Sequence, residues 1–242
     1  MKAAVAQQRS LLELTGVDAE LGRLEHRSKH LAEQQKVDEV QAEHTAANDR
    51  LAVLGIALED LAEQIAKFET EIDSVRQRED RDRALLDGGS VPAKQVAEIQ
   101  HELETLQRRQ SSLEDSQLEV MERREDLVAQ QADELARIDE LQTALTEAQQ
   151  ARDAALAAID ASRHQSLSRR DALVAEIDGE LVAMYERQRA RGGAGAGALQ
   201  GRRCGACRIE IDRGEIARIT AAADDDVLRC PECGAILLRV TP

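Results

Sequence analysis

Aromatic side chains are almost absent from this sequence. Its 242 residues include one Phe, one Tyr and no Trp, whereas charged residues make up 33% of the chain. Large aromatic side chains fill much of a globular core, and a chain without them has little material with which to build one. The composition therefore argues against a single large globular domain.

Proline and long apolar runs are also scarce. The three prolines stand at positions 92, 231 and 242. No apolar run approaches the roughly 20 residues that span a bilayer, and the opening MKAAVAQQRS lacks the apolar core of a signal peptide. We therefore expect a cytoplasmic protein with no membrane partner.

Positive charge is in deficit. The formal net charge is -15, and residues 201–242 carry seven Arg against seven Asp and Glu, so the whole deficit lies in residues 1–200. Binding to duplex nucleic acid or to anionic membranes needs clustered Lys and Arg. The long acidic part of the chain argues against both as general partners.

What remains is mostly Ala, Leu, Glu, Gln and Arg, a composition typical of long helices and coiled coils. We expect the first helix to begin with Ser10 and Glu13 as a capping box, or a few residues earlier in AAVAQQ. Apolar residues then recur at alternating steps of three and four. The clearest series is Leu51, Leu54, Leu58, Leu61, Ile65, Phe68, Ile72 and Val75. Because six residues separate Leu31 from Val37, we expect a local change in helical winding there.

The helical pattern breaks at LLDGGSVPAKQ, where Asp87 to Gly89 favour a turn and Ser90 to Pro92 favour the start of a second helix. A short turn makes the two helices antiparallel neighbours. A turn centred on the glycines places residue i opposite residue 177 minus i, and therefore Phe68 opposite residue 109. The predicted fold is mainly α: a long antiparallel coiled-coil hairpin over residues 1–190, with its tip near 86–91, followed by a small β domain.

The end of the second helix extends beyond the first in this register. Its apolar pattern continues through Leu181, Met184 and Tyr185, so we expect this end to be covered by the tail or by a second copy of the chain. Homo-oligomerisation through this exposed end is therefore one expectation. Residues 191–203 follow, rich in Gly and Ala. By composition they favour a flexible joint, and the alternative is a first strand of the tail domain.

The tail concentrates all the cysteines of the chain. They are Cys204, Cys207, Cys230 and Cys233. Two CxxC pairs separated by 22 residues can surround one tetrahedral zinc ion, and four thiolate ligands close the site to hydrolytic chemistry. A redox pair would need a thioredoxin-like βαβ context, which the sequence lacks.

We therefore predict one structural zinc ion per chain, held by a β zinc ribbon over residues 204–242. In the second knuckle, Pro231 fixes the turn and Gly234 permits the backbone conformation that directs amides toward the sulfurs. Expected strands lie at 209–211, 227–229 and 235–240, with a helical turn in DRGEIARITAAA.

The combination of hairpin and ribbon resembles the bacterial C4-type zinc-ribbon, coiled-coil protein family. The resemblance rests on LLELTGVDAEL with Leu11, Leu14, Asp18 and Leu21, on AKQVAEIQHELETL at 93–106, and on CGAC with LRCPECGAILL. It implies that the glycines after Arg191 form the first ribbon strand. It also implies an interaction protein, since members are associated with nucleic-acid binding and with chaperone-like contacts to transcription or secretion components.

Three functions are compatible with these features, and none is enzymatic, because the sequence shows no catalytic constellation or phosphate loop. The first is an adaptor or chaperone-like protein that binds partner proteins through hairpin and ribbon. The second is a nucleic-acid binder that uses a basic neck. The neck residues are Arg187, Arg189, Arg191, Arg202 and Arg203. The third is a hairpin factor of RNA polymerase, suggested by Asp80, Asp82 and Asp87 near the tip.

The predicted binding surface lies where the second helix meets the ribbon. It joins Leu181, Met184 and Tyr185, as contacts for a protein, to the arginines of the basic neck. In the alternative arrangement, the ribbon docks on this end of the helix and covers it.

Overall fold

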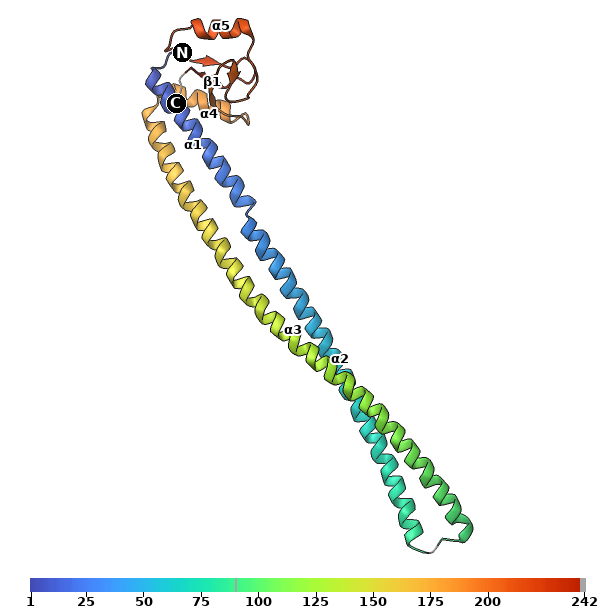
Figure 1. Ribbon diagram of the computed structural model, residues 1–242. Coiled ribbons are helices and arrows are strands. Elements are labelled where there is room, and N and C mark those ends of the chain that lie inside the picture. The colour runs from blue at the N-terminus through green and yellow to red at the C-terminus, as the bar shows by residue number, and fades with distance from the viewer. Residues whose placement is uncertain (90, 240–242) are drawn as a thin grey trace. The chain divides into compact units, whose positions relative to one another are not determined.

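The computed structural model describes residues 1–89 and 91–239 (Figure 1). The contacts within the chain divide it into two compact units. The hairpin unit is Gln35–Gln149. The ribbon unit combines Met1–Gln34 with the chain from Gln150 onward. The expected helix start at Ser90 and the end of the expected strand 235–240 lie outside the described residues. Among those described, no helix is both long enough and apolar enough to cross a membrane.

Four helices make up the coiled-coil part of the chain. They are α1 (Val5–Lys29), α2 (Ala32–Asp87), α3 (Ala93–Glu176) and α4 (Gly179–Arg189). Helix α1 begins at Val5, so the expected capping box at Ser10 is wrong and the earlier start is correct. Ser10 lies inside the helix, where its hydroxyl donates to the carbonyl of Ala6 at 3.3 Å.

A break separates α1 from α2 at the place where the apolar spacing predicts a change in winding. The backbone of His30 leaves the helical region, with φ -128° and ψ 55°. Its amide still donates to the carbonyls of His26 and Arg27, at 3.1 and 3.2 Å. The phase change between Leu31 and Val37 is therefore absorbed by an interruption of the helix rather than by altered winding.

In the hairpin unit, α2 and α3 pack side by side as the apolar pattern predicts (Figure 1). One cluster of buried residues consists of Val37, Val40, Ala47, Leu141 and Leu145. Phe68 is half-buried. Ion pairs join Glu71 to Arg109 at 3.4 Å and Arg76 to Glu114 at 2.7 Å, so residues of α2 lie opposite later residues of α3 than the predicted register gives. The connection extends to Pro92, and its midpoint therefore lies later in the chain than the two glycines.

The ribbon unit contains a small four-stranded sheet and a short helix. The elements are β1 (Ala196–Gln200), β2 (Arg203–Cys204), α5 (Arg213–Ala221), β3 (Leu228–Arg229) and β4 (Ile236–Leu238). The strand order is β2-β1-β4-β3, in which β1 and β4 are parallel and the other pairs antiparallel. Residues 209–211 form no strand, in contrast to our expectation. Only Glu210 pairs there, through an isolated bridge to Arg203.

The Gly- and Ala-rich segment is a strand and not a flexible joint, because β1 occupies the middle of the sheet. Its small residues are required by close approach. A Cβ atom on Gly197 would lie 2.5 Å from the amide nitrogen of Ala206, and one on Gly195 would lie 2.4 Å from the ring of Tyr185. Larger side chains would collide with the first cysteine turn or with α4, which explains why the β-branched residues usual in strands are missing.

Strand β4 connects two hydrophobic cores because its side chains alternate. Ile236 and Leu238 belong to a cluster that includes buried residues of α1, α3 and α4. Leu237, between them, belongs to a second cluster with Cys204, Cys230 and two isoleucines. The sheet therefore has both faces buried, one against helices and the other against the cysteine side of the ribbon.

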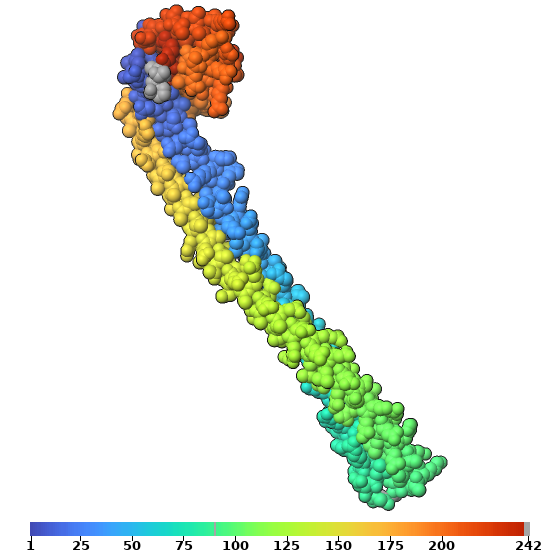
Figure 2. Space-filling model, in the orientation of Figure 1, coloured from blue at the N-terminus to red at the C-terminus, as the bar shows by residue number. Residues whose placement is uncertain are grey.

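The first residues of the chain also belong to the ribbon unit. The amide of Ala3 donates to the carbonyl of Asp225 at 2.8 Å, and the buried Gln8 donates from Nε2 to the carbonyl of Asp224 at 2.9 Å. Figure 2 shows the same neighbourhood at the surface, where the blue N-terminal residues lie beside the red ribbon. The ribbon unit is thus assembled from segments at opposite ends of the sequence.

Candidate functional site

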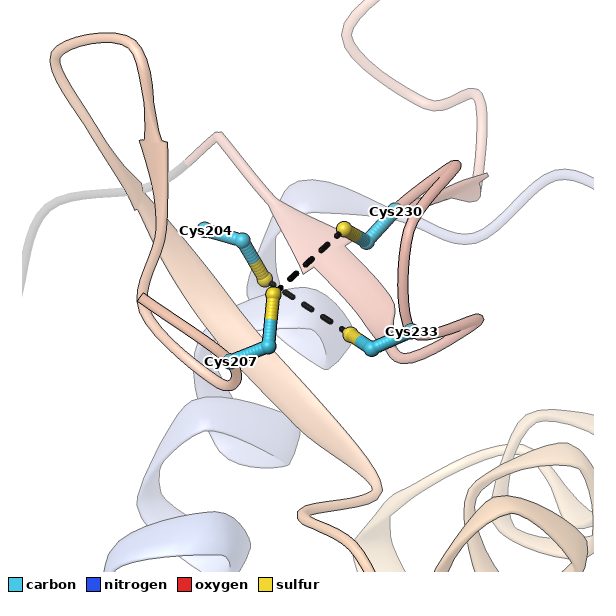
Figure 3. Close-up of side chains that lie close together, drawn as sticks. All are labelled: Cys204, Cys207, Cys230 and Cys233. Carbon is cyan, nitrogen blue, oxygen red and sulfur yellow. Dashed lines mark hydrogen bonds between the residues drawn. The ribbon is translucent and has the colours of Figure 1, made fainter. Parts of the chain in front are cut away.

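The four cysteines converge on one point between two loops (Figure 3). Their sulfur atoms all lie within 4.8 Å of one another. Cys204 Sγ is 4.0 Å from Cys233 Sγ, and Cys207 Sγ is 3.9 Å from Cys230 Sγ. A tetrahedral zinc site with bonds of about 2.3 Å has sulfur atoms about 3.8 Å apart. The four thiols therefore fit a zinc ion, and each would supply one ligand.

The two cysteine turns share one backbone pattern. In the first, the amide of Arg208 donates to the carbonyl of Cys204 at 2.8 Å, and the amide of Cys204 donates to the carbonyl of Ile209 at 3.1 Å. In the second, the amide of Gly234 donates to the carbonyl of Cys230 at 3.0 Å. The amide of Cys230 completes the pattern by donating to the carbonyl of residue 235 at 2.9 Å. The site is thus two copies of one turn facing each other.

One residue in each turn adopts a left-handed backbone conformation. Gly234 has φ 75°, as the sequence predicts for the second turn, and Arg208 has φ 64° at the matching position of the first. This region costs a residue with a side chain roughly 1–2 kcal/mol. The first turn therefore carries backbone strain that the second avoids.

Burial raises the pKa of a cysteine thiol, and hydrogen bonds from backbone amides lower it. Burial raises the pKa of Cys204, and it raises the pKa of Cys233 to about 12. A hydrogen bond from the amide of Ile209 lowers the pKa of Cys207. The thiols of Cys204 and Cys233 therefore resist ionisation by themselves, and a bound cation would supply the positive charge that stabilises four thiolates together.

Helix α4 supports the second cysteine turn directly. Gln188 is buried and donates from Nε2 to the carbonyl of Cys233 at 2.8 Å.

Arg239 supports α5 by donating from Nη1 to the carbonyls of Ile219 and Ala222, at 3.1 and 2.6 Å. The guanidinium thus satisfies carbonyl groups that the end of a helix leaves open.

A buried ionic network lies on the helical side of the sheet, and the sequence reasoning missed it. Asp18, whose side chain is 5% exposed, accepts from Arg170 Nε at 2.8 Å through Oδ1. Its Oδ2 accepts from the Tyr185 hydroxyl at 2.7 Å and forms an ion pair with Arg189 Nη1 at 3.2 Å. Glu186 contacts both arginines. The sequence indicated this network only through Asp18 itself, an acidic residue that directly follows Val17 of the apolar seam.

The predicted end of the second hairpin helix is α4 in the structure, and other parts of the chain cover it. Leu181 is 0% exposed and Tyr185 is 1% exposed, within the cluster that β4 completes. Met184 is half-buried against the same cluster. The prediction that Leu181 and Tyr185 form an exposed surface for a partner or a second copy is therefore wrong. The alternative, in which the ribbon docks here, is correct.

The predicted arginines of the neck separate into two groups. Arg189 contacts Asp18 and Glu186, as described above, and Arg202 forms an ion pair with Glu210 at 2.8 Å. Arg187, Arg191 and Arg203 are exposed, and no carboxylate of the described residues forms an ion pair with them. The neck is thus less basic at its surface than its sequence suggests.

Comparison with known proteins places both parts of the chain. The model of the CT398-like coiled-coil hairpin domain matches residues 14–193, and that of the C4-type zinc ribbon domain matches residues 203–237. An uncharacterized protein of Mycobacterium tuberculosis is 63% identical over 240 residues, which cover 99% of this chain and 98% of that protein. One of Mycobacterium leprae is 48% identical over 225 residues, covering 93% and 97%.

Solved structures are also similar to this chain. A structure from Mycobacterium smegmatis is 73% identical, with a TM-score of 0.87, and the match covers 99% of this chain and 100% of that one. CT398 from Chlamydia trachomatis is 17% identical, with a TM-score of 0.71 over 96% and 97% of the two chains, and so shares the fold. The chain belongs to the CT398-like coiled-coil hairpin family and carries a C4-type zinc ribbon domain.

Proposed function

We propose that this protein is a non-enzymatic interaction protein that binds partner proteins through its hairpin unit, while one structural zinc ion per chain stabilises its ribbon. Two considerations support a role without catalysis. Four thiolates around a zinc ion leave no position for water or substrate. Both matching families are described as structural domains, a hairpin and a ribbon.

The observation that carries the proposal is apolar surface on the hairpin unit. Met121, Val128 and Leu135 of α3 are 41%, 45% and 51% exposed, and seven residues separate each from the next. Residues seven apart lie on one face of a helix. Leu118, 57% exposed, is three residues before Met121 and extends the same face. Single exposed apolar side chains are ordinary, but an aligned series is typical of a surface that binds another protein.

Affinity capture from a cell lysate, with and without nuclease, tests this function. The informative variant of the full chain is Met121→Gln with Val128→Gln and Leu135→Gln. We expect it to lose partner proteins that wild type retains after nuclease treatment. Its matched control is Glu122→Gln with Ala129→Gln and Ala136→Gln, which changes exposed residues at the same spacing on the adjacent face. Equal capture by the variant and wild type would contradict the proposal.

A second candidate, nucleic-acid binding, is favoured by a different observation on the ribbon unit. Several exposed arginines there form no ion pair with a carboxylate of the described residues. They are Arg187, Arg191, Arg203, Arg208, Arg213 and Arg229. Free guanidinium groups suit phosphates. The combined change Arg203→Glu and Arg229→Glu should then abolish salt-dependent binding of single-stranded RNA, and undiminished binding would exclude this surface.

A further inference from the structure

One groove of the hairpin unit combines an apolar floor with an uncompensated acidic rim. Two adjoining hollows between α2 and α3, of about 460 and 510 Å³, share Gln130 in their linings. The apolar lining residues are Val53, Leu54, Ala57, Leu61 and Leu127. The acidic lining residues include Asp49, Asp60, Asp126 and Asp133. We call this feature the aspartate groove.

The floor of the groove is incompletely covered by the two helices that form it. Val53 is 65% exposed, and Leu54 and Leu61 are half-buried although both belong to the apolar seam. A third apolar stripe placed along this groove would remove these side chains from water. Each square ångström so buried contributes roughly 25 cal/mol.

The rim of the groove carries negative charge that the chain does not neutralise. Its lining contains two basic residues, and both are already paired with glutamates: Arg50 with Glu134 at 2.6 Å and Arg123 with Glu119 at 3.5 Å. All four rim aspartates are exposed, and within residues 1–89 and 91–239 none forms an ion pair. The carboxylates therefore remain available to cations from outside the chain.

The positions of the aspartates match the repeat of a helix. Asp49 and Asp60 are eleven residues apart on α2, and Asp126 and Asp133 are seven apart on α3. Steps of seven and eleven residues return to nearly the same face of a helix. Each hollow has one aspartate from each helix on its rim, so both sides of the groove are acidic. From residue 49 to residue 64 the groove follows α2 for roughly 22 Å at 1.5 Å per residue.

We propose that the aspartate groove binds a basic amphipathic helix of a partner protein, which adds a third helix to the hairpin unit. The partner contributes an apolar stripe to the floor and Lys or Arg on both flanks of that stripe, as in the flanking positions of a coiled coil. This inference rests on the proposed function and specifies the chemistry of the partner. It concerns a different surface from the stripe of Met121, Val128 and Leu135.

The negative charge of the groove favours a basic helix over a second copy of the chain, nucleic acid or anionic lipid. A second copy of this chain carries a formal net charge of -15 and would bring further carboxylates to an acidic rim. Nucleic acid and anionic lipid are repelled for the same reason. A basic helix gains from the rim and the floor together, and its association is weakened by salt.

A designed peptide tests the groove. The probe has about three heptads, with Leu at positions a and d and Lys at e and g, because flanking lysines hinder its self-association. We expect this peptide to bind the full-length chain in fluorescence anisotropy, and to bind at least about tenfold more weakly when the salt concentration rises from 50 to 500 mM. The same peptide with Glu at e and g should not bind. Equal binding of both peptides overturns the proposal.

Substitutions locate the site. The combined variant Asp49→Asn, Asp60→Asn, Asp126→Asn and Asp133→Asn keeps shape and removes charge, and should weaken binding of the lysine peptide at least about tenfold while circular dichroism stays unchanged. A control variant, Asp115→Asn with Asp139→Asn, changes two exposed aspartates of α3 outside the groove and should bind like wild type. Unchanged binding by the first variant, or equal loss by the control, overturns the proposal.

The groove and the proposed function can fail separately. Partner capture could depend on Met121, Val128 and Leu135 while the lysine peptide binds the four-aspartate variant as tightly as wild type. In that case the proposed function stands and the groove is excluded. If the peptide binds the groove but no protein is captured through the hairpin unit, the proposed function falls while the groove keeps its preference for basic helices. If sedimentation shows that wild type is a dimer, and that the Asp→Asn changes in the groove strengthen this dimer, the groove binds a second copy and the basic helix is excluded.

Discussion

The hydroxyl of Tyr185 donates a 2.7 Å hydrogen bond to Oδ2 of Asp18, and the two residues are 167 positions apart in the chain. This bond joins the start of the coiled coil to the helix that precedes the ribbon. Because the chain has no Trp and a single Tyr, the intrinsic fluorescence of the protein reports on this one place. Tyrosine fluorescence is therefore a probe of the ribbon unit.

Removing the two ends of this bond should have unequal effects. Tyr185→Phe deletes one hydrogen bond and leaves Asp18 its two arginines, so it should reduce the free energy of unfolding by about 1–2 kcal/mol. Asp18→Ala removes the buried carboxylate that Arg170 and Arg189 share and leaves them Glu186 alone, so it should cost more, about 3 kcal/mol. Urea unfolding followed by circular dichroism measures both. Equal costs would mean that the hydroxyl and not the ion pairs holds the network.

The same environment predicts how stability depends on alkaline pH. Burial, followed by the hydrogen bond to Asp18, raises the pKa of Tyr185 above its ordinary value of 10.0. The native state therefore keeps the phenolic proton where the unfolded state loses it. This contribution is complete below pH 10 and decreases as pH rises above it. Absorbance at 295 nm should show the phenolate appearing together with unfolding, and in Tyr185→Phe the decline should be smaller.

Metal removal should act first on the ribbon unit. We expect one zinc ion per chain in wild type and a loss of about 10-fold or more in affinity for Cys230→Ser, because one of four ligands is gone. A chelator should change the fluorescence of Tyr185 through β4, whose side chains touch both cores, while most of the helical circular dichroism of α2 and α3 remains. Unchanged fluorescence in the metal-free protein would show that the two cores are independent.

The two left-handed positions of the cysteine turns form a matched pair. Arg208→Gly should stabilise the zinc-loaded protein by about 0.5–1 kcal/mol, since glycine adopts a positive φ without steric cost. Gly234→Ala should destabilise it by about 1–2 kcal/mol. Its new Cβ would also lie 3.2 Å from Gln188 Oε1. Denaturant unfolding in excess zinc, monitored by Tyr185, compares them, and a stabilising Gly234→Ala would contradict the assigned backbone.

Glu79 offers a stabilising change in the hairpin unit. It occupies an apolar position of the seam, seven residues after Ile72, and is 3% exposed. Its Oε2 accepts from Arg83 at 2.8 Å, whereas Oε1 has no hydrogen-bond partner among the described residues. Glu79→Leu removes the unsatisfied atom and should raise the free energy of unfolding by about 1 kcal/mol. A lower thermal midpoint in this variant would show that the carboxylate has a partner of its own.

The hairpin and the two cysteine turns were predictable from the sequence because both follow from local spacing. The repeat from Leu51 to Val75 determines one face of a helix, and each CxxC pair forms within a single turn. The predicted register was wrong, because the place of the turn depends on how far the connection to Pro92 extends. The length of the connection between α2 and α3 cannot be read from the spacing of apolar residues within the helices.

The ribbon unit could not be predicted in the same way because its contacts join distant segments. The role of Asp18 depends on Arg170, Tyr185 and Arg189, which come close only after the hairpin has formed. The strand β1 depends on neighbours too: its glycines suggest a flexible joint until Ala206 and Tyr185 are seen to touch them. Tertiary contact, and not local propensity, decides the structure here.

The assembly of the ribbon unit from both ends of the sequence also has a consequence in time. Leu14 and Leu238 share one core although 224 residues separate them. At about 5–20 residues per second, a ribosome needs roughly 10 to 45 s between the two. During that interval the apolar face of α1 has no ribbon to cover it, while α2 and α3 can already pair. The core around Leu11 and Leu14 thus stays incomplete until synthesis reaches β4, and this is the period in which a chaperone could act on the nascent chain.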